Sequence, residues 1–299
     1  MNIIEFEDIC LKIGSSEILS NVTFDVQKGD IFCLVGNNGA GKSSLIRILL
    51  GLTTSYTGKV RISLSSDLCK SRERIGSVID SLKVNTHISA ERYLHDICRI
   101  HGIPTGSCSE ILDKVGLADV GRKHIVHYSL GMKRRLMIAG ALVGRPDILV
   151  LDEPFNGIDP KGMAELRLLL YELSKEGITI FLTSHNIPEL IKLATKFGVM
   201  NSGHFVDIVT QNLQGVSVHK TVIGTDAPKQ LISALKKIFP DVYAFPAEAD
   251  AVYVLGGVDM TGLSKIIDSA DLHGRIFYTD DRPMNMEELL LWKMNVRPD

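Results

Sequence analysis

The sequence has little net charge, no long apolar run and no run of five like charges among its 299 residues. The formal net charge of −2 argues against nucleic acid as the main partner, because neutralising phosphates requires a concentrated basic surface. No stretch approaches the ~18 apolar residues that a membrane-spanning helix needs. Residues 1–8 also lack the basic and then apolar build of a signal peptide. We therefore expect a cytoplasmic chain that meets a membrane only through a partner.

Cysteine pairs of the CxxC type are also missing. The five cysteines are odd in number and scattered, so neither a disulfide framework nor a zinc site is expected, and reduced thiols are the better interpretation. The 45% of hydrophobic and 23% of charged residues are typical of a folded globular chain. The length predicts two domains, since one domain usually holds roughly 100 to 200 residues.

The first two thirds of the chain have the pattern of an α/β protein. Apolar and polar residues alternate from residue 3 onward, which predicts consecutive β-strands that end in the continuously apolar stretch Ile31–Val35. A helix is expected from Lys42 to about Gly51, and mainly helical structure from residue 80 to 128. Apolar strands at 148–151 and 178–183 then alternate with helices after Gly131 and from Pro160. This alternation predicts a parallel sheet.

The pattern restarts after about residue 210. Strands are expected at 217–223, 251–255 and 275–278, and helices at 228–239, 261–270 and 284–294. We therefore predict two domains: residues 1–210, with a helical subdomain at about 80–128, and a small accessory α+β domain at 217–299.

A glycine-rich phosphate-binding motif, G-x-x-x-x-G-K-[ST], lies directly after the apolar strand and directly before the helix, which is the context that it requires. Glycines let backbone N–H groups surround a polyphosphate, and the helix N-terminus adds partial positive charge. Lys42 would reach the β- and γ-phosphates, and the Ser43 hydroxyl would ligate Mg²⁺. The predicted nucleotide-binding residues are Gly36, Asn37, Asn38, Gly39, Ala40, Gly41, Lys42, Ser43 and Ser44.

Two carboxylates and a histidine follow the later strands. Asp152 and Glu153 end the strand 148–151, at the edge of the sheet where ligands of α/β proteins bind. Asp152 would hold Mg²⁺, and Glu153 would orient or deprotonate the attacking water. His185 follows the strand 178–183 and would contact the γ-phosphate and that water. By itself, an Asp-Glu pair at the end of a strand more often lies in a solvated turn, and a lone histidine is usually structural. The phosphate loop makes a catalytic role the better interpretation of these residues.

The stretch Tyr128–Arg135 resembles the signature motif of the ABC ATPase family. It is a variant that keeps Ser129 and Gly131 and has Leu130 and Met132 at the neighbouring positions. The resemblance covers about residues 4–206 and includes Asn156–Asp159, which is similar to the family's D-loop. Asp159 also suits an N-cap before Pro160. The form of the signature is similar to the subgroup that serves bacitracin and lantibiotic self-protection.

The resemblance implies a P-loop NTPase core of the ABC type with an antiparallel β subdomain and a helical subdomain. It further implies an ATP- and Mg²⁺-dependent ATPase that pairs with a second copy, so that Ser129 and Gly131 meet the γ-phosphate held by the opposite chain. Transmembrane permease subunits would dock on the helical block and place the protein at the inner face of the membrane. Export of an antimicrobial peptide is the expected role.

Two positions depart from the family pattern. Where the family has an aromatic residue that stacks on adenine, this chain has Ile13. Where the family has the Q-loop glutamine, the chain has Asp80, an acidic candidate for contact with Mg²⁺ that is one methylene shorter than glutamate.

Two other functions remain open at this level. A soluble ABC ATPase that acts on ribosomes or DNA commonly carries two cassettes, a long coiled-coil insertion or a basic surface, none of which is visible. A small-molecule P-loop kinase would lack the signature and the D-loop.

Overall fold

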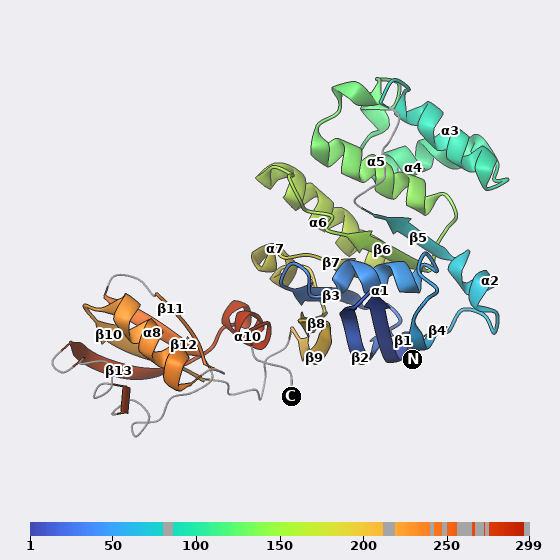
Figure 1. Ribbon diagram of the computed structural model, residues 1–299. Coiled ribbons are helices and arrows are strands. Elements are labelled where there is room, and N and C mark those ends of the chain that lie inside the picture. The colour runs from blue at the N-terminus through green and yellow to red at the C-terminus, as the bar shows by residue number, and fades with distance from the viewer. Residues whose placement is uncertain are drawn as a thin grey trace. The chain divides into compact units, whose positions relative to one another are not determined.

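The computed structural model describes residues 1–79, 86–211, 219–239, 242–246, 250–255, 265–266, 272 and 275–295. The chain forms two compact units, Met1–Ile208 and Val209–Asp299 (Figure 1), and each is described by itself. In the described ranges no helix is both long and apolar enough to cross a membrane.

The first unit is organised around a six-stranded sheet in the order β5-β6-β7-β3-β8-β9. The pairs β5–β6, β6–β7, β7–β3 and β3–β8 are parallel. Every residue of β3, β6 and β7 is buried, which explains their continuously apolar sequences. The strands are β3 (Ile31–Gly36), β5 (Ile75–Val78), β6 (Ile148–Asp152), β7 (Thr179–Thr183), β8 (Lys196–Asn201) and β9 (His204–Thr210).

A second, antiparallel sheet has the order β2-β1-β4, made by β1 (Asn2–Ile13), β2 (Ser16–Gln27) and β4 (Thr57–Ile62). Its inner face shares one hydrophobic core with the six-stranded sheet and with helix α1 (Lys42–Leu49). Aromatic rings link the sheets: Phe24 stacks on Phe32 at 5.5 Å between centroids, and Phe32 stacks on Phe181 at 5.7 Å. This packing fixes the strand that carries the phosphate loop.

Helices α3, α4 and α5 pack on one another and form the block seen together in Figure 1. Ser89 caps α3 by accepting a hydrogen bond from the Arg92 N–H at 3.2 Å. The other helices of the unit follow α1 along the chain. Their bounds are α2 (Leu68–Arg72), α3 (Ala90–Ile100), α4 (Cys108–Lys114), α5 (Leu130–Leu142), α6 (Pro160–Lys175) and α7 (Ile187–Ile191), with 3₁₀ turns at Thr105–Ser107, Ala118–Val120 and Ile125–His127.

The start of α6 confirms the expected N-cap position of Asp159 before Pro160, without a side-chain cap. Asp159 occupies the N-cap position, but in the described structure its carboxylate accepts no capping hydrogen bond from the first turn. Pro160 at the first helical position has no N–H to satisfy and already holds the φ angle of a helix, so the start of α6 depends less on a side-chain cap.

The second unit contains a four-stranded antiparallel sheet in the order β11-β12-β10-β13. Helix α8 packs on it, and this order and connectivity match the split βαβ arrangement. The strand Tyr243–Pro246 was not predicted, because it is short and ends in a proline at the sheet edge. Residues 217–218 and most of 261–270, where a strand start and a helix were expected, lie outside the described residues. The elements are β10 (His219–Thr225), α8 (Pro228–Ile238), β11 (Tyr243–Pro246), β12 (Ala251–Leu255), β13 (Ile276–Pro283) and α10 (Met286–Lys293).

Candidate functional site

Three neighbouring strands bring the predicted polar residues to one edge of the parallel sheet. Strands β6, β7 and β3 are adjacent, and Asp152 at the end of β6 is the register partner of Thr183 at the end of β7. Thr183 in turn lies opposite Leu34 of β3, two residues before the phosphate loop begins at Gly36. The carboxyl ends of these strands therefore meet at one site.

The phosphate loop needs glycine at three positions for different reasons. Gly39 and Gly41 have φ angles of 82° and 99°, which residues with a side chain rarely adopt. A Cβ on Gly41 would also lie 2.5 Å from Leu19 Cδ2, and a Cβ on Gly36 would lie 2.6 Å from the Met200 carbonyl oxygen. The loop is therefore pressed against β2 and β8, and its N–H groups are presented at the start of α1.

Lys42 is buried, with 7% of its surface exposed. Its ammonium donates hydrogen bonds to the carbonyls of Gly36 at 2.6 Å and Asn37 at 3.1 Å. Burial lowers the pKa of Lys42, and the nearby carboxylates of Glu153 and Asp152 oppose that shift. The ammonium of Lys42 is thus held in place by carbonyl groups of the phosphate loop.

Asp152 is positioned by two hydroxyl groups. Ser43 Oγ donates to Asp152 Oδ1 at 3.3 Å, and Thr183 Oγ1 donates to the same oxygen at 2.5 Å. Magnesium prefers oxygen ligands about 2.1 Å away in an octahedron, so neighbouring ligands lie about 3.0 Å apart. The separation of Ser43 Oγ and Asp152 Oδ1 fits that geometry, and these two residues would hold the ion.

Glu153 is held in an uncommon backbone conformation directly after β6, with a φ angle of 47°. Its N–H donates to both the carbonyl and the hydroxyl oxygen of Thr183, each at 3.1 Å. Its carboxylate lies 3.0 Å from His185 Nδ1 and also accepts a weak bond from the His185 N–H at 3.4 Å. A left-handed conformation at a non-glycine residue costs roughly 1 kcal/mol and is typical of functional sites.

An open cavity of about 470 Å³ joins these elements. Thr183, whose hydroxyl contacts both Asp152 and the Glu153 N–H, is a site residue that the sequence analysis did not single out. A hydroxyl residue at the end of an apolar strand beside an acidic one was the available signal. The cavity is lined by Ile18, Asn38, Gly39, Ala40, Gly41, Lys42, Ser43, Ser44, Glu153, Asn156 and His185.

Ile13, which replaces an aromatic residue of the family, does not line this cavity. It ends β1 opposite Ser16 and is 62% exposed. A large apolar residue that does line the cavity is Ile18 of β2. Asp80, the candidate Q-loop residue, lies outside the described residues.

The signature residues lie elsewhere in the unit. Ser129 caps α5 by accepting a hydrogen bond from the Met132 N–H at 3.2 Å. Gly131 is buried against α6, where a Cβ would lie 3.3 Å from Ile158 Cγ2 and 3.6 Å from Gly162 Cα. As far as the described residues extend, neither Ser129 nor Gly131 lines the cavity of its own chain.

Comparison with known proteins decides the family. The family model described as "ABC transporter" matches residues 19–156. The bacitracin transport ATP-binding protein BcrA of Enterococcus faecalis is 35% identical, over 69% of each chain. This chain belongs to the ABC transporter ATP-binding family. As an ABC ATPase it binds nucleotide and hydrolyses ATP.

Other members of the ABC transporter ATP-binding family agree in sequence and in fold. The BcrA protein of Bacillus licheniformis is 37% identical over 69% of each chain, and the lantibiotic transport ATP-binding protein SrtF of Streptococcus pyogenes is 33% identical over 68% of this chain and 89% of its own. A nucleotide-free ATP-binding cassette superimposes with a TM-score of 0.65 at 21% identity, and covers 70% of this chain and 92% of its own. The predicted ABC-type α/β core is therefore confirmed.

Proposed function

We propose that two copies of this ABC ATPase enclose two ATP·Mg²⁺ and drive export through separate membrane subunits. The observation that carries the two-chain mechanism is the separation of two anion-binding features within one chain. The phosphate loop, Glu153 and His185 share a cavity, whereas Ser129 and Gly131 lie outside it. A second chain supplies the missing half of each site.

The site residues have distinct roles in this proposal. Lys42 and the loop N–H groups hold the β- and γ-phosphates, and Ser43 and Asp152 hold Mg²⁺, which neutralises charge on those phosphates when it is bound. Glu153 accepts the proton of the attacking water or orients it. His185, 3.0 Å from Glu153, donates toward that carboxylate and faces the γ-phosphate.

A groove beside the helical block supports docking of permease subunits. A cavity of about 300 Å³ lies between β5, α3 and α5 and is lined by Val78, Tyr93, Ile97 and Met137, among others. Ile100 at its rim is 81% exposed, which is a large exposed area for an isoleucine. We assign this groove to the permease, which would hold the subunit at the inner face of the membrane.

The transported substrate is proposed to be a peptide antibiotic. The proteins at 33–37% identity named above are described as serving bacitracin or lantibiotic transport. Export of such a peptide would confer resistance on the cell that makes this protein.

Trapping of a nucleotide-dependent dimer tests the shared site. We would compare the purified chain with Glu153→Gln in ATP turnover and in size on a sizing column with ATP, with and without candidate permease subunits. The matched control is Glu172→Gln, an exposed carboxylate on α6 outside the cavity. We expect Glu153→Gln to bind ATP, to stop hydrolysing and to accumulate as a dimer.

Each outcome decides one part of the proposal. Stimulation of wild-type turnover by permease subunits would establish coupling to transport. If Glu153→Gln remains monomeric with ATP bound, the shared site is wrong. If its turnover is unchanged, Glu153 does not activate the water.

A further inference from the structure

The guanidinium of Arg135 joins three helices of the first unit. Arg135 lies on α5, and its Nη1 donates to the carbonyls of Val115 at 3.0 Å and Gly116 at 3.2 Å, at the end of α4. Its Nη2 lies 3.0 Å from Glu165 Oε2 on α6, and the side chain is only 14% exposed. The last carbonyls of a helix lack partners within the helix and carry partial negative charge, so an arginine satisfies and neutralises them together.

Gly116 shows how closely the Arg135 guanidinium packs against the end of α4. Its φ angle is 66°, and a Cβ at this position would lie 2.8 Å from Arg135 Nη1. The chain therefore turns at the end of α4 in a conformation that glycine favours, and this turn leaves room for the guanidinium.

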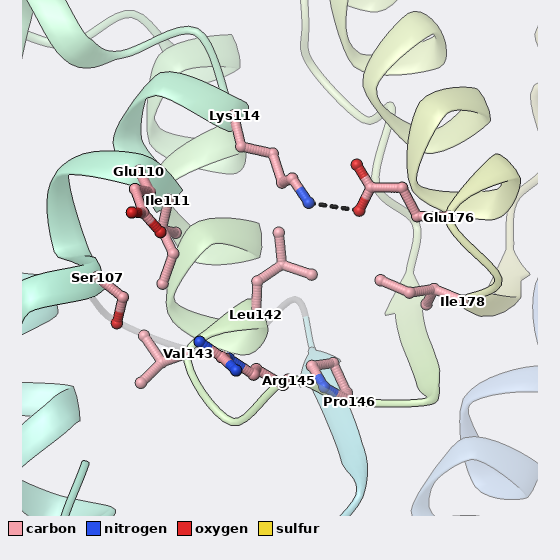
Figure 2. A pocket seen from close by; sticks show the side chains of 10 residues that line it. All are labelled: Ser107, Glu110, Ile111, Lys114, Leu142, Val143, Arg145, Pro146, Glu176 and Ile178. Carbon is pink, nitrogen blue, oxygen red and sulfur yellow. Dashed lines mark hydrogen bonds and ion pairs between the residues drawn. The ribbon is translucent and has the colours of Figure 1, made fainter. Parts of the chain in front are cut away.

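A second ion pair joins α4 directly to α6. Lys114, in the last turn of α4, pairs with Glu176, the C-cap residue of α6, and both residues line a cavity of about 400 Å³ (Figure 2). A carboxylate at a helix C-terminus opposes the helix dipole, and the lysine compensates for it. Glu165 and Glu176 are about three helical turns apart, so both face the same side of α6.

Helix α5, which carries Arg135, also carries the signature residue Gly131 in its first turn. Arg135 lies about one turn after Gly131 on the same face of α5. Gly131 packs against Gly162 in the first turn of α6, with 3.6 Å between the Gly131 Cβ position and the Gly162 Cα. The position of the first turn of α5 therefore depends on how α4, α5 and α6 are joined.

We propose that Arg135 is a positioning residue for ATP hydrolysis. With Lys114 it fastens the end of α4 to α6, and it thereby sets the place at which Ser129 and Gly131 meet the nucleotide of the opposite chain. The inference rests on the two-chain function proposed above. A lysine at position 135 cannot replace the arginine, because a single ammonium lacks the planar fork that spans Val115, Gly116 and Glu165.

The test separates the chain's own nucleotide site from the site that it completes in its partner. We would measure turnover against ATP concentration, binding of a fluorescent ATP analogue to the separate chain, and thermal unfolding for Arg135→Ala and Arg135→Lys. Dimer formation would be measured for both in the Glu153→Gln background. The control is Arg122→Ala, whose side chain is 92% exposed beside Glu91.

We expect both Arg135 variants to bind the analogue like the wild type and to lose roughly ten- to a hundredfold in kcat, since a misplacement near 1 Å can cost about a hundredfold. They should also form less dimer, whereas Arg122→Ala should behave like the wild type. Exchange of the second pair, Lys114→Glu with Glu176→Lys, should restore the turnover that either single change removes.

Three results would overturn the proposal. An unchanged kcat in Arg135→Ala removes the positioning role. Full activity in Arg135→Lys shows that charge alone suffices. Loss of analogue binding together with early unfolding assigns Arg135 to folding. If Glu153→Gln with an intact Arg135 forms no dimer, the two-chain function fails instead, and the two failures are distinguishable.

Discussion

His185 Nδ1 lies 3.0 Å from Glu153 Oε2, and the two residues come from the ends of adjacent parallel strands. When Nδ1 donates its proton to the carboxylate, Nε2 is left to accept one or to face a ligand. His185 is 52% exposed and Glu153 is 16% exposed. The pair therefore lies at the boundary between the buried strand ends and the open cavity.

The first prediction concerns His185. His185→Ala should lower kcat roughly a hundredfold, because the imidazole no longer orients Glu153 or contacts the transferred phosphate. Binding of ATP should change little, since Lys42 and the loop N–H groups hold the phosphates. Steady-state turnover and analogue binding would measure the two effects. His204→Ala, on β9 away from the cavity, is the control. Equal loss in both variants would contradict the assignment.

The second prediction concerns Thr183, whose hydroxyl donates to Asp152 and accepts from the Glu153 N–H. Thr183→Val should remove both bonds, destabilise the unit by about 1–3 kcal/mol and lower turnover, whereas Thr183→Ser should retain turnover. Thr179→Val is matched to it, because that buried hydroxyl accepts from the Gly29 N–H at the other end of β7. Thr179→Val should lower the stability of the unit and leave turnover unchanged. Urea unfolding and ATPase assays would show whether the two losses separate.

The third prediction concerns the contact between α5 and α6. A Cβ at Gly162 would lie 2.6 Å from Ile158 Cγ2 and 2.9 Å from Asp159 Oδ1. Gly162→Ala should therefore cost about 1–3 kcal/mol of stability by overpacking and should disturb the signature. Gly144→Ala is the control, since nothing lies within 4 Å of its Cβ position. Thermal unfolding of both variants would test this, and equal midpoints would show that Ile158 moves aside freely.

The fourth prediction concerns pH. The pKa of Glu189 is lowered by its hydrogen bond to Lys192 and further by Arg167, although burial opposes this. Because the folded-state pKa is below the ordinary value of 4.5, the stabilisation is complete above that value and is lost as the pH falls through the lowered pKa.

Glu189→Gln should therefore lower the free energy of unfolding by about 1–3 kcal/mol at neutral pH and by much less in acid. Urea unfolding of both proteins at several pH values would measure the difference. Glu110→Gln, an exposed carboxylate on α4, should show no such convergence. A Glu189→Gln penalty that stays constant into acid would contradict the role of the ion pair.

Much of the first unit follows from its sequence because its signals are local. The apolar strands β3, β6 and β7 and the phosphate loop between β3 and α1 each follow from a short stretch of residues. The prediction of an ABC-type fold also depended on the signature motif. That motif identifies the family, and the fold was then inferred from the family rather than from local patterns.

The unpredicted features depend on contacts distant in sequence. The bond from Thr183 to Asp152 spans 31 positions, and Ile18 reaches the cavity only because β2 packs beside the phosphate loop. The edge strand Tyr243–Pro246 is too short and too near a proline for its pattern to be distinctive. The division of the chain near residue 209 is a structural fact, whereas the accessory role of the second unit stays a prediction.

Two sets of contacts link the end of α4 to α6, the Lys114–Glu176 ion pair and the contacts of Arg135, and they differ in solvent exposure. The side chains of Lys114 and Glu176 are 40% and 48% exposed, whereas that of Arg135 is 14% exposed. An exposed ion pair contributes about 0.2–1 kcal/mol, and its effect weakens as salt rises. The helical block is therefore held by one largely buried set of contacts, made by Arg135, and one exposed ion pair, Lys114–Glu176. Raised salt would therefore weaken the Lys114–Glu176 pair more than the contacts of Arg135.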